Sequence, residues 1–576
     1  TYVIRSRNQW WIDSGIAGLY NIAIQHQIAS KHNISVTIEN KTMVLHYSDR
    51  EQLGEFLSDC YEKLAEMYWN VSTKRQIEDP KAVFYDADND EFMLKPKRNP
   101  TPIPNLFTKG SSWRLPDDKS GIPWDEIDDS LKPRLEKFLT ETRAELWGSK
   151  KVLLLKDPVC HKELDILPVE GRRKNVCSIC GQQSSKCSDV SQPTYLLFAS
   201  NTATKSFNSE GGKADKVCWE CEFLSRFAVD SASYKKIFPT IKRKNASAEN
   251  IRKFYDLFIV QVVSPDLKKT INMVEKVGAS SSIRQLDTEN YYCNIRTDKN
   301  SLITYSRLPF EFLWAFYSDW YGLLRQEWET KQSSQDHSLL DELLGISLED
   351  APLQLVLLVV GNKGQTFIIK NIIFYNDTAY VFRLMNLMDD TNISFSGLYN
   401  SLYNRVDKDK ENDFRNEFFY RVLNKKSVVL QTERFAYHVS MLSKEDQPVF
   451  LKEIVDFVRF YETEMGVAQM NREQVEVAVN LGKSIVLQAR QNLNPDEFKK
   501  VKGDLFTLRK SRTKGTFLSQ INTLQLRYGL TVSGRIAEGI LENVPFEEFK
   551  AYCMLGALNT FNSFTKAKKD EGGQQA

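Results

Sequence analysis

The sequence lacks the short motifs that mark common enzyme families. Its six histidines form no HExxH pair, and no GxSxG nucleophile turn is present. The string Gly482-Lys483-Ser484 resembles the end of a phosphate-binding loop, but Val477 stands where that loop needs its first glycine. Adjacent acids such as Asp128-Asp129 are commonplace in loops. Local motifs therefore indicate no catalytic residue, although an active site assembled from distant residues is not excluded.

Long hydrophobic runs are also absent, and we expect no secretory leader. The longest apolar run, residues 355–360, is far too short to span a bilayer, and the first residues carry no apolar signal-peptide core. Nine cysteines, an odd number, do not suit a secreted disulfide framework. The formal net charge of +2 over 576 residues means that any nucleic-acid surface is a local patch. We expect a soluble, cytoplasmic protein of several domains with no membrane partner.

Four of the cysteines form two CxxC pairs, Cys177/Cys180 and Cys218/Cys221. Two residues between cysteines allow both sulfurs to reach one ion, and Gly181 suits the turn after the first pair. Two pairs supply four thiolates, which close a tetrahedral site and leave no open position. The sequence therefore predicts a structural zinc ion.

Two other interpretations of the cysteines stay open. The pairs are further apart than in a usual zinc ribbon, so the four residues can also be reduced cysteines packed as small hydrophobic side chains. Substitute ligands lie nearby, and nothing in their spacing prefers them: Cys160, His161 and Cys187.

Local patterns in the first half predict mixed α and β structure. We expect a helix after Trp10-Trp11, capped by Asp13 or Ser14, in which Gly15 and Gly18 allow close approach of a neighbouring backbone. Residues 34–47 read as a hairpin and residues 51–69 as an amphipathic helix. The stretch 195–199 resembles a short strand within polar loops.

The sequence pattern of the second half predicts a β meander followed by helices. Residues 353–360, 366–375 and 378–384 read as three antiparallel strands, and from about residue 448 the pattern is helical. Asn494-Pro495 is a strong helix start. The predicted fold class is α+β, with four domains: residues 1–150 (N-terminal α+β region), 151–260 (zinc-knuckle region), 261–445 (α+β region with the meander) and 446–576 (C-terminal helical bundle).

Basic residues are spaced along the predicted C-terminal helices as in a surface that binds a nucleic-acid backbone. The alternative is a set of ordinary solubilising side chains. A proline-rich loop adds Lys97 and Arg98, and basic clusters occur at residues 172–174 and 242–244. The candidate nucleic-acid-binding residues of the helices are Arg472, Lys483, Arg490, Lys499, Lys502, Arg509, Lys510, Arg512 and Lys514.

Three of these features together resemble a known family. Residues 11–18, the two cysteine pairs and the C-terminal helical bundle are similar to the large subunit of type I CRISPR effector complexes (Cascade), most like subtype I-B. The resemblance covers most of the chain loosely and implies a non-enzymatic role. Such a subunit contacts the short motif that flanks the target, stabilises the opened DNA and recruits a helicase-nuclease.

The resemblance also implies partners. These are a guide-RNA complex with backbone and RNA-end-binding subunits, the target duplex and its displaced strand, and a helicase-nuclease or transposition proteins, in a prokaryotic cytoplasm. In this family the C-terminal bundle can also be made separately as a small subunit, for which Met465 or Met470 is a hypothetical start. Two other hypotheses are a zinc-containing nucleic-acid enzyme with a dispersed active site and a scaffold that recruits transposition proteins.

Overall fold

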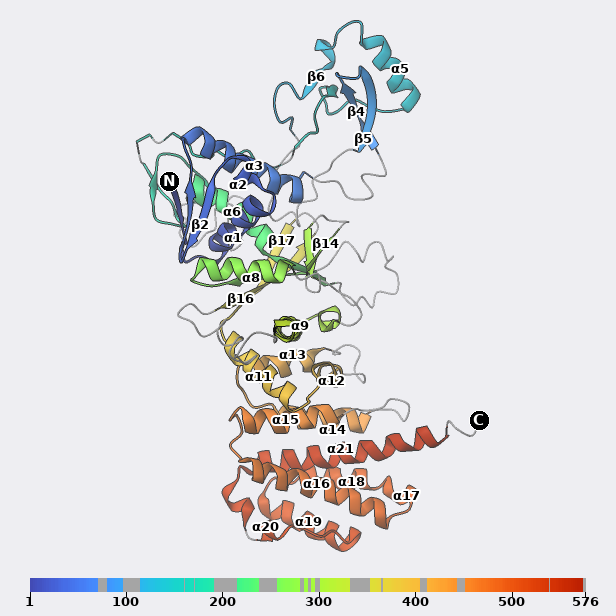
Figure 1. The fold of residues 1–576 in the computed structure, drawn as a ribbon. Helices are drawn as coiled ribbons and strands as arrows, with labels where there is room; N and C mark the ends of the chain where they lie inside the picture. The colour runs from blue at the N-terminus through green and yellow to red at the C-terminus, as the bar shows by residue number, and fades with distance from the viewer. Residues whose placement is uncertain are drawn as a thin grey trace. The chain divides into compact units, whose positions relative to one another are not determined.

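The computed structural model has the predicted α+β fold class, with several sheets and a helical C-terminal region (Figure 1). It describes residues 1–70, 80–96, 114–159, 161–169, 171–172, 174–190, 215–237, 256–279, 284–287, 292–295, 301–331, 353–363, 366–403, 412–442, 451–537 and 539–572. The chain forms two compact units. The N-terminal unit comprises Thr1–Arg296 and Gly345–Thr378, and the C-terminal unit comprises Thr297–Leu344 and Ala379–Ala576.

The N-terminal unit begins with a three-stranded sheet and its helices. Strands β1 (Tyr2–Arg5), β3 (Thr42–His46) and β2 (Ser35–Glu39) pair antiparallel in that order, and the predicted hairpin at residues 34–47 is confirmed. Helix α3 (Arg50–Tyr68) confirms the predicted amphipathic helix and is capped by the Asp49 side chain. The short helix α2 (Ile28–Lys31) follows α1 (Trp10–Gln25).

The predicted cap of α1 is wrong, because the helix starts earlier. Gln9 is the N-cap, and its side-chain oxygen accepts the backbone N–H of Ile12. Asp13 lies inside the helix and instead accepts the backbone N–H groups of Arg7 and Gln9, so its carboxylate orders the loop before α1. Ser14 is buried in the helix interior.

The backbones of α1 and α6 (Trp219–Ser231) lie in close contact. A Cβ atom added to Gly15 would lie 2.0 Å from the Leu224 carbonyl oxygen, and one added to Gly18 would lie 2.0 Å from that of Phe227. No real Cβ contact is that short, so only glycine fits at these two positions. The predicted role of this glycine pair is confirmed, and the neighbouring backbone belongs to α6.

A small sheet occupies residues 80–159. Strands β5 (Glu91–Pro96), β4 (Pro80–Asp86), β7 (Val152–Leu154) and β6 (Gly121–Pro123) lie in that order. Leu135 of α5 (Lys132–Thr142) packs with Val83 and Leu153 on one face, while Phe84 and Leu154 form a second cluster with other residues. The 3-10 helix η1 (Trp124–Glu126) follows β6.

The largest sheet of the N-terminal unit has six strands and contains only part of the predicted meander. Its order is β14 (Arg284–Asp287), β15 (Tyr292–Ile295), β12 (Ser233–Ile237), β13 (Asp256–Val263), β16 (Gln354–Lys363) and β17 (Thr366–Tyr375). Strands β16 and β17 pair antiparallel, as predicted. Helix α8 (Leu267–Ala279) contacts both β13 and α1. Strands from both sides of the predicted boundary at residue 260 join this one sheet.

The third predicted strand, residues 378–384, is wrong. These residues begin α11 (Thr378–Asp390), in which Val381, Leu384, Met385 and Met388 are fully buried. Their spacing of three and four residues fits one helix face, and this longer pattern outweighs the short run of β-forming residues that the sequence presents first.

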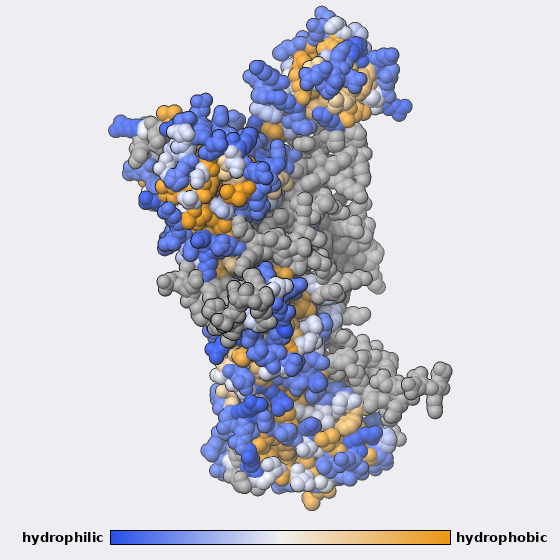
Figure 2. Space-filling model, in the orientation of Figure 1, coloured by the Kyte–Doolittle hydropathy of each residue, from blue (hydrophilic) through white to orange (hydrophobic). Residues whose placement is uncertain are grey.

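The C-terminal unit is helical. Its first helices are η2 (Leu302–Tyr305), α9 (Pro309–Lys331), α12 (Phe395–Ser401), α13 (Asp413–Leu423) and α14 (Val429–Leu442). They are followed by α15 (Lys452–Glu464), α16 (Arg472–Asn492), α17 (Pro495–Phe498), α18 (Val501–Arg509), α19 (Lys514–Tyr528), α20 (Gly534–Ala537), η5 (Ile540–Asn543) and α21 (Phe546–Gly572). In the view of Figure 2 hydrophilic residues cover much of these helices, with hydrophobic ones scattered between them.

Helix α21 is the centre of this bundle, because it contacts α14, α15, α16 and α18 (Figure 1). Its closest neighbour is α16. A Cβ atom on Gly482 would lie 1.8 Å from the Cys553 carbonyl oxygen, and one on Gly556 would lie 2.2 Å from that of Val479. Gly482, which stands in the rejected phosphate-loop string, therefore allows two helices to touch.

The helix predicted from Asn494 begins as expected but ends early. Asn494 accepts the backbone N–H of Glu497, which confirms the start, but α17 stops at Phe498. Residues 499–500 form a turn before α18 begins at Val501. The predicted row of Lys499, Lys502 and Arg509 on one continuous helix is therefore wrong.

Two further observations concern the chain as a whole. None of the described helices is both long enough and apolar enough to cross a membrane. Several predictions fall outside the described residues: the strand at 195–199, the loop with Lys97 and Arg98, and the basic cluster at 242–244. The boundaries of the four predicted domains stay predictions.

Substituting Gly482→Ala should destabilise the C-terminal bundle, because the added methyl overlaps the α21 backbone. Overpacking of this kind typically costs about 1–3 kcal/mol. Gly503→Ala in α18 is the matched control, because nothing lies within 4 Å of its added Cβ. Alanine there should stabilise the helix by about 0.5–1 kcal/mol. Thermal unfolding followed by circular dichroism checks both, and equal melting temperatures for the two variants would contradict the prediction.

Candidate metal centre and basic-aromatic surface

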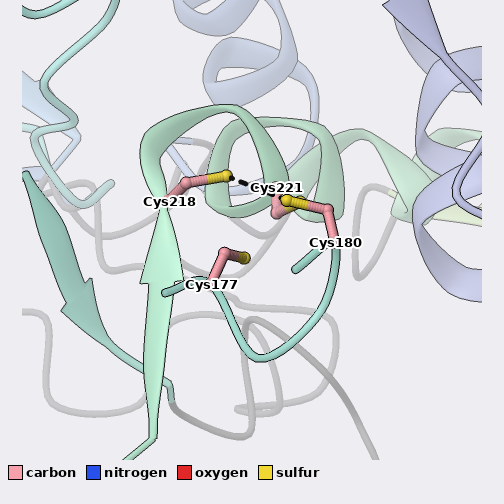
Figure 3. A group of neighbouring side chains, drawn as sticks. All are labelled: Cys177, Cys180, Cys218 and Cys221. Carbon is pink, nitrogen blue, oxygen red and sulfur yellow. Dashed lines mark hydrogen bonds between the residues drawn. The ribbon is translucent and has the colours of Figure 1, made fainter. Parts of the chain in front are cut away.

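The four cysteines of the two CxxC pairs converge on one point (Figure 3). Their sulfur atoms all lie within 4.8 Å of one another, and Cys180 Sγ lies 3.8 Å from Cys218 Sγ. Four thiolates around a tetrahedral ion with metal–sulfur distances of about 2.3 Å are separated by about 3.8 Å. A disulfide needs about 2.05 Å, and the four cysteines are free. The donor set therefore fits a metal ion.

Each cysteine pair is positioned by its own local structure. Cys177 and Cys180 lie on a turn closed by the hydrogen bond from the Gly181 N–H to the Cys177 carbonyl, at 2.9 Å. Gly181 has a φ of +72°, which glycine adopts without strain. The short strands β8 (Asn175–Val176) and β9 (Gln183–Ser184) flank this turn. The first pair is thus a compact knuckle.

The second pair lies where a strand becomes a helix. Cys218 ends β11 (Lys216–Cys218) and is the N-cap of α6, and Cys221 lies in the first turn of that helix. The Ser178 N–H and hydroxyl both donate to the Lys216 carbonyl, at 2.8 and 3.0 Å, and join the knuckle to β11. The positive end of the α6 dipole faces the thiols and favours their ionised form.

Without a cation the four thiols compete for protons. The pKa of Cys177 is lowered because the other three thiols donate hydrogen bonds to it, and the pKa of Cys221 is raised because it donates to the others and is buried. A sulfur that keeps its proton cannot serve as a thiolate ligand. A divalent ion that replaces these protons would allow all four sulfurs to ionise together.

A buried ion pair lies beside the cysteines. The Arg7 guanidinium contacts the Glu220 carboxylate, and the two side chains are only 8% and 11% exposed. Tyr2 donates to the same carboxylate at 3.2 Å. Burial lowers the pKa of Arg7, but Glu220 and three of the cysteines raise it more, so the guanidinium stays charged. Arg7 therefore offsets part of the negative charge that four thiolates would carry.

The substitute ligands considered from the sequence do not join the cluster. The ring of His161 contacts Asn70 through Nδ1 at 2.7 Å and Glu62 through Nε2 at 2.8 Å. Cys187 lies opposite Cys218 in the pairing of β10 (Cys187–Asp189) with β11, but outside the group of four. Cys160 is outside the described residues. Among the residues that the structure describes, no other group of three or more histidines, cysteines or carboxylates is placed to hold a metal.

The structure shows which of the predicted nucleic-acid-binding residues make contacts within the bundle. Arg509 binds the Glu433 carboxylate through Nε at 2.6 Å and Nη2 at 3.1 Å, Lys502 donates to the Met441 carbonyl, and Lys514 donates to that of Glu542. Arg472 contacts two carboxylates, and Arg490 lies over the Phe498 ring. Lys483, Lys499, Lys510 and Arg512 are exposed, and Lys510 also lies over the Phe506 ring.

Two aromatic rings that the sequence did not indicate complete a surface with these cations. Tyr437 of α14 and Phe506 of α18 stack with ring centroids 6.1 Å apart and planes 22° apart. Arg509 lies 4.1 Å from the centre of the Tyr437 ring, and Lys510 lies 4.0 Å from that of Phe506. Phe506 is 39% exposed. We call Tyr437, Phe506, Arg509 and Lys510 the basic-aromatic surface.

Of the two rings, only Phe506 could have been noticed from the sequence. Val501, Leu505 and Leu508 form the buried stripe of α18, and Phe506 lies off that stripe, where a large apolar side chain must face water. Tyr437 lies 69 residues earlier on another helix, so only the packed bundle brings the rings together.

Replacing Cys177 with serine should abolish metal binding, because three thiolates cannot close a tetrahedral site. Cys187→Ser is the matched control, since Cys187 lies outside the cluster and its variant should keep one ion per chain. Elemental analysis of the purified chains measures the metal, and thermal unfolding should show a lower melting temperature for Cys177→Ser alone. Equal metal content in the two variants would reject the four-cysteine site.

Comparisons with known proteins assign no role to the residues of these sites. No family model matches the chain, and no curated protein matches it either. The role of these residues is therefore argued from their chemistry.

Proposed function

We propose that the chain is a non-catalytic, zinc-containing subunit that binds nucleic acid in an RNA-guided DNA surveillance complex. The observation that carries the nucleic-acid part is the basic-aromatic surface. An exposed ring beside a lysine, stacked on a second ring beside an arginine, is the combination that single-stranded nucleic acids recognise. The bases stack on the rings, and Lys510 attracts the phosphates, since Arg509 is paired with Glu433.

The proposed ion of the four-cysteine site is Zn²⁺. An all-thiolate set with no open position suits zinc as a structural ion and offers no place for a substrate. Cys177, Cys180, Cys218 and Cys221 would hold it and fix the start of α6. Zinc in such a site contributes folding free energy and takes no part in a reaction.

The role in an RNA-guided complex comes from the resemblance of residues 11–18, the cysteine pairs and the C-terminal bundle to the Cascade large subunit. In such complexes guide pairing reads the sequence, while protein contacts the flanking motif and stabilises the displaced strand. We propose the basic-aromatic surface, with the nearby exposed Lys499 and Arg512, as the place where the displaced strand binds. Recruitment of a helicase-nuclease, or of transposition proteins, is the remaining part of the proposal.

The surface suits a single strand better than a duplex. Stacking requires a base whose face is free, and the bases of a duplex are already stacked on one another. Stacking on a protein ring contributes about 1–3 kcal/mol per base and depends little on sequence. A strand opened by guide pairing of any sequence meets that requirement.

Charge reversal of all predicted cations is a poor test, because Arg509 and Lys502 are bonded within the bundle. Phe506→Ala removes the exposed ring and should weaken binding of a labelled single-stranded thymidine oligonucleotide by the full chain about 5- to 150-fold. Phe506→Tyr keeps a ring and should bind nearly as wild type. Fluorescence anisotropy measures the affinity.

A second variant separates charge from stacking. Lys510→Gln should lower the slope of log affinity against log salt by about 0.7, the value for one phosphate contact on a single strand. Lys137→Gln on α5, whose side chain is 77% exposed, is the matched control and should leave the slope unchanged. Binding that is insensitive to both Phe506→Ala and Lys510→Gln would remove the surface from the proposal and favour a scaffold for proteins.

A further inference from the structure

Two cavities of the C-terminal unit share the turn between α11 and α12. The smaller has a volume of about 420 Å³ and lies between this turn and α9. The larger, about 560 Å³, lies between the same turn and helices α15 and α16. Asn392, Ile393 and Ser394 line both of them. The two cavities therefore border the same turn, and we call them together the acidic groove.

The smaller cavity is lined by hydrogen-bond acceptors. Asp319 of α9 and Asp389 of α11 line it together with the hydroxyls of Ser318, Ser394 and Ser396. None of the described residues that line it is a lysine, arginine or histidine. Asp389 contacts Arg325, whose side chain is 43% exposed and lies outside the lining. The cavity is thus suited to a group that only donates hydrogen bonds.

Each cavity is lined by one residue that carries a buried polar atom with no hydrogen-bond partner among the described residues. In the smaller one it is Ser318 Oγ, on a residue only 7% exposed, and in the larger one it is Arg459 Nε. A buried polar atom without a partner costs about 1–3 kcal/mol, so such atoms are usually satisfied by a group from outside. The Ser318 hydroxyl can accept or donate a hydrogen bond, whereas the Arg459 Nε–H only donates. A ligand that carries both a donor and an acceptor fits these two atoms.

The charge of the groove excludes a nucleic-acid strand. Its lining carries more carboxylates than cations, in contrast to the basic-aromatic surface of the same unit. The carboxylates are Asp319, Asp389, Glu453, Asp456, Glu464 and Glu476, and the cations are Lys452, Arg459 and Arg472. Phosphates would meet this excess of negative charge at close range. Charge complementarity therefore favours a positively charged ligand.

We propose that the acidic groove binds an extended, basic segment of a partner protein. An arginine or lysine side chain of the segment enters the smaller cavity, where Asp319 and the Ser318 hydroxyl accept its N–H groups. A guanidinium has five donors and no acceptor, which matches this lining. A backbone carbonyl of the segment accepts the Arg459 Nε–H in the larger cavity.

A single metal ion fits the groove less well than a peptide. A Ca²⁺ ion takes six to eight oxygen ligands, and both carboxylates of the smaller cavity already have partners. Asp389 contacts Arg325 and Tyr321, and Asp319 accepts the Ser301 hydroxyl. The two cavities also extend over more space than one ion needs. A peptide side chain and its neighbouring backbone use both cavities together.

The test measures binding of a fluorescein-labelled peptide of alternating arginine and glycine to the full chain by anisotropy. Asp319→Asn removes the proposed carboxylate partner and should weaken binding at least tenfold, since a hydrogen bond to a charged group contributes about 1.5–3 kcal/mol. Glu417→Gln on α13 is the matched control, because Glu417 pairs with Arg421 outside the groove. It should bind as wild type.

A second variant distinguishes a loss of peptide binding from a loss of folding. Ser396 is exposed at the smaller cavity, so Ser396→Lys should fold, place a cation there and abolish peptide binding. Ser563→Lys on exposed α21 surface is its control. Equal losses in groove and control variants, equal binding of a glutamate–glycine peptide, or displacement of the peptide by millimolar Ca²⁺ would each overturn the proposal. This inference is independent of the proposed function, since Phe506→Ala should leave peptide binding intact.

Discussion

The position of helix α6 is the constraint on which much of the N-terminal unit depends. Its N-cap and first turn carry Cys218 and Cys221 of the four-cysteine cluster, and its later carbonyl groups lie against Gly15 and Gly18 of α1. Such close backbone contact tolerates no shift of either helix. A metal that fixes the start of α6 therefore also fixes α1, and through α1 the packing against α8 and β13. The buried Arg7–Glu220 pair joins the same two regions through charge.

The C-terminal unit repeats this principle without a metal. Gly482 and Gly556 bring α16 and α21 into backbone contact, and the remaining helices pack around α21. The resulting bundle presents two surfaces of opposite chemistry. Exposed rings with cations suit bases and phosphates, whereas the acidic groove suits a donor-only side chain. We propose that this one bundle serves two ligand classes, because the residues that line the two surfaces differ in charge.

Local sequence patterns predicted the helices and strands that depend on interactions between residues close together in the chain. The hairpin at residues 34–47 depends on its own turn, and α3 and α16 depend on apolar spacing within one helix. The same reasoning was wrong at residues 378–384, where a short run of β-forming residues belongs to the longer helix α11. It was also wrong at the start of α1, where Gln9 rather than Asp13 provides the cap.

The sequence by itself indicated the four cysteines as a candidate metal site, because the two-residue spacing within each pair already sets two sulfurs side by side. It also indicated that Gly15 and Gly18 meet a backbone. Only the tertiary structure decided which one, and only packing brought Tyr437 to Phe506, Arg7 to Glu220 and Asp319 to Asp389. These partners are far apart in the chain, so no local period or spacing relates them. Their contacts are consequences of how whole helices pack.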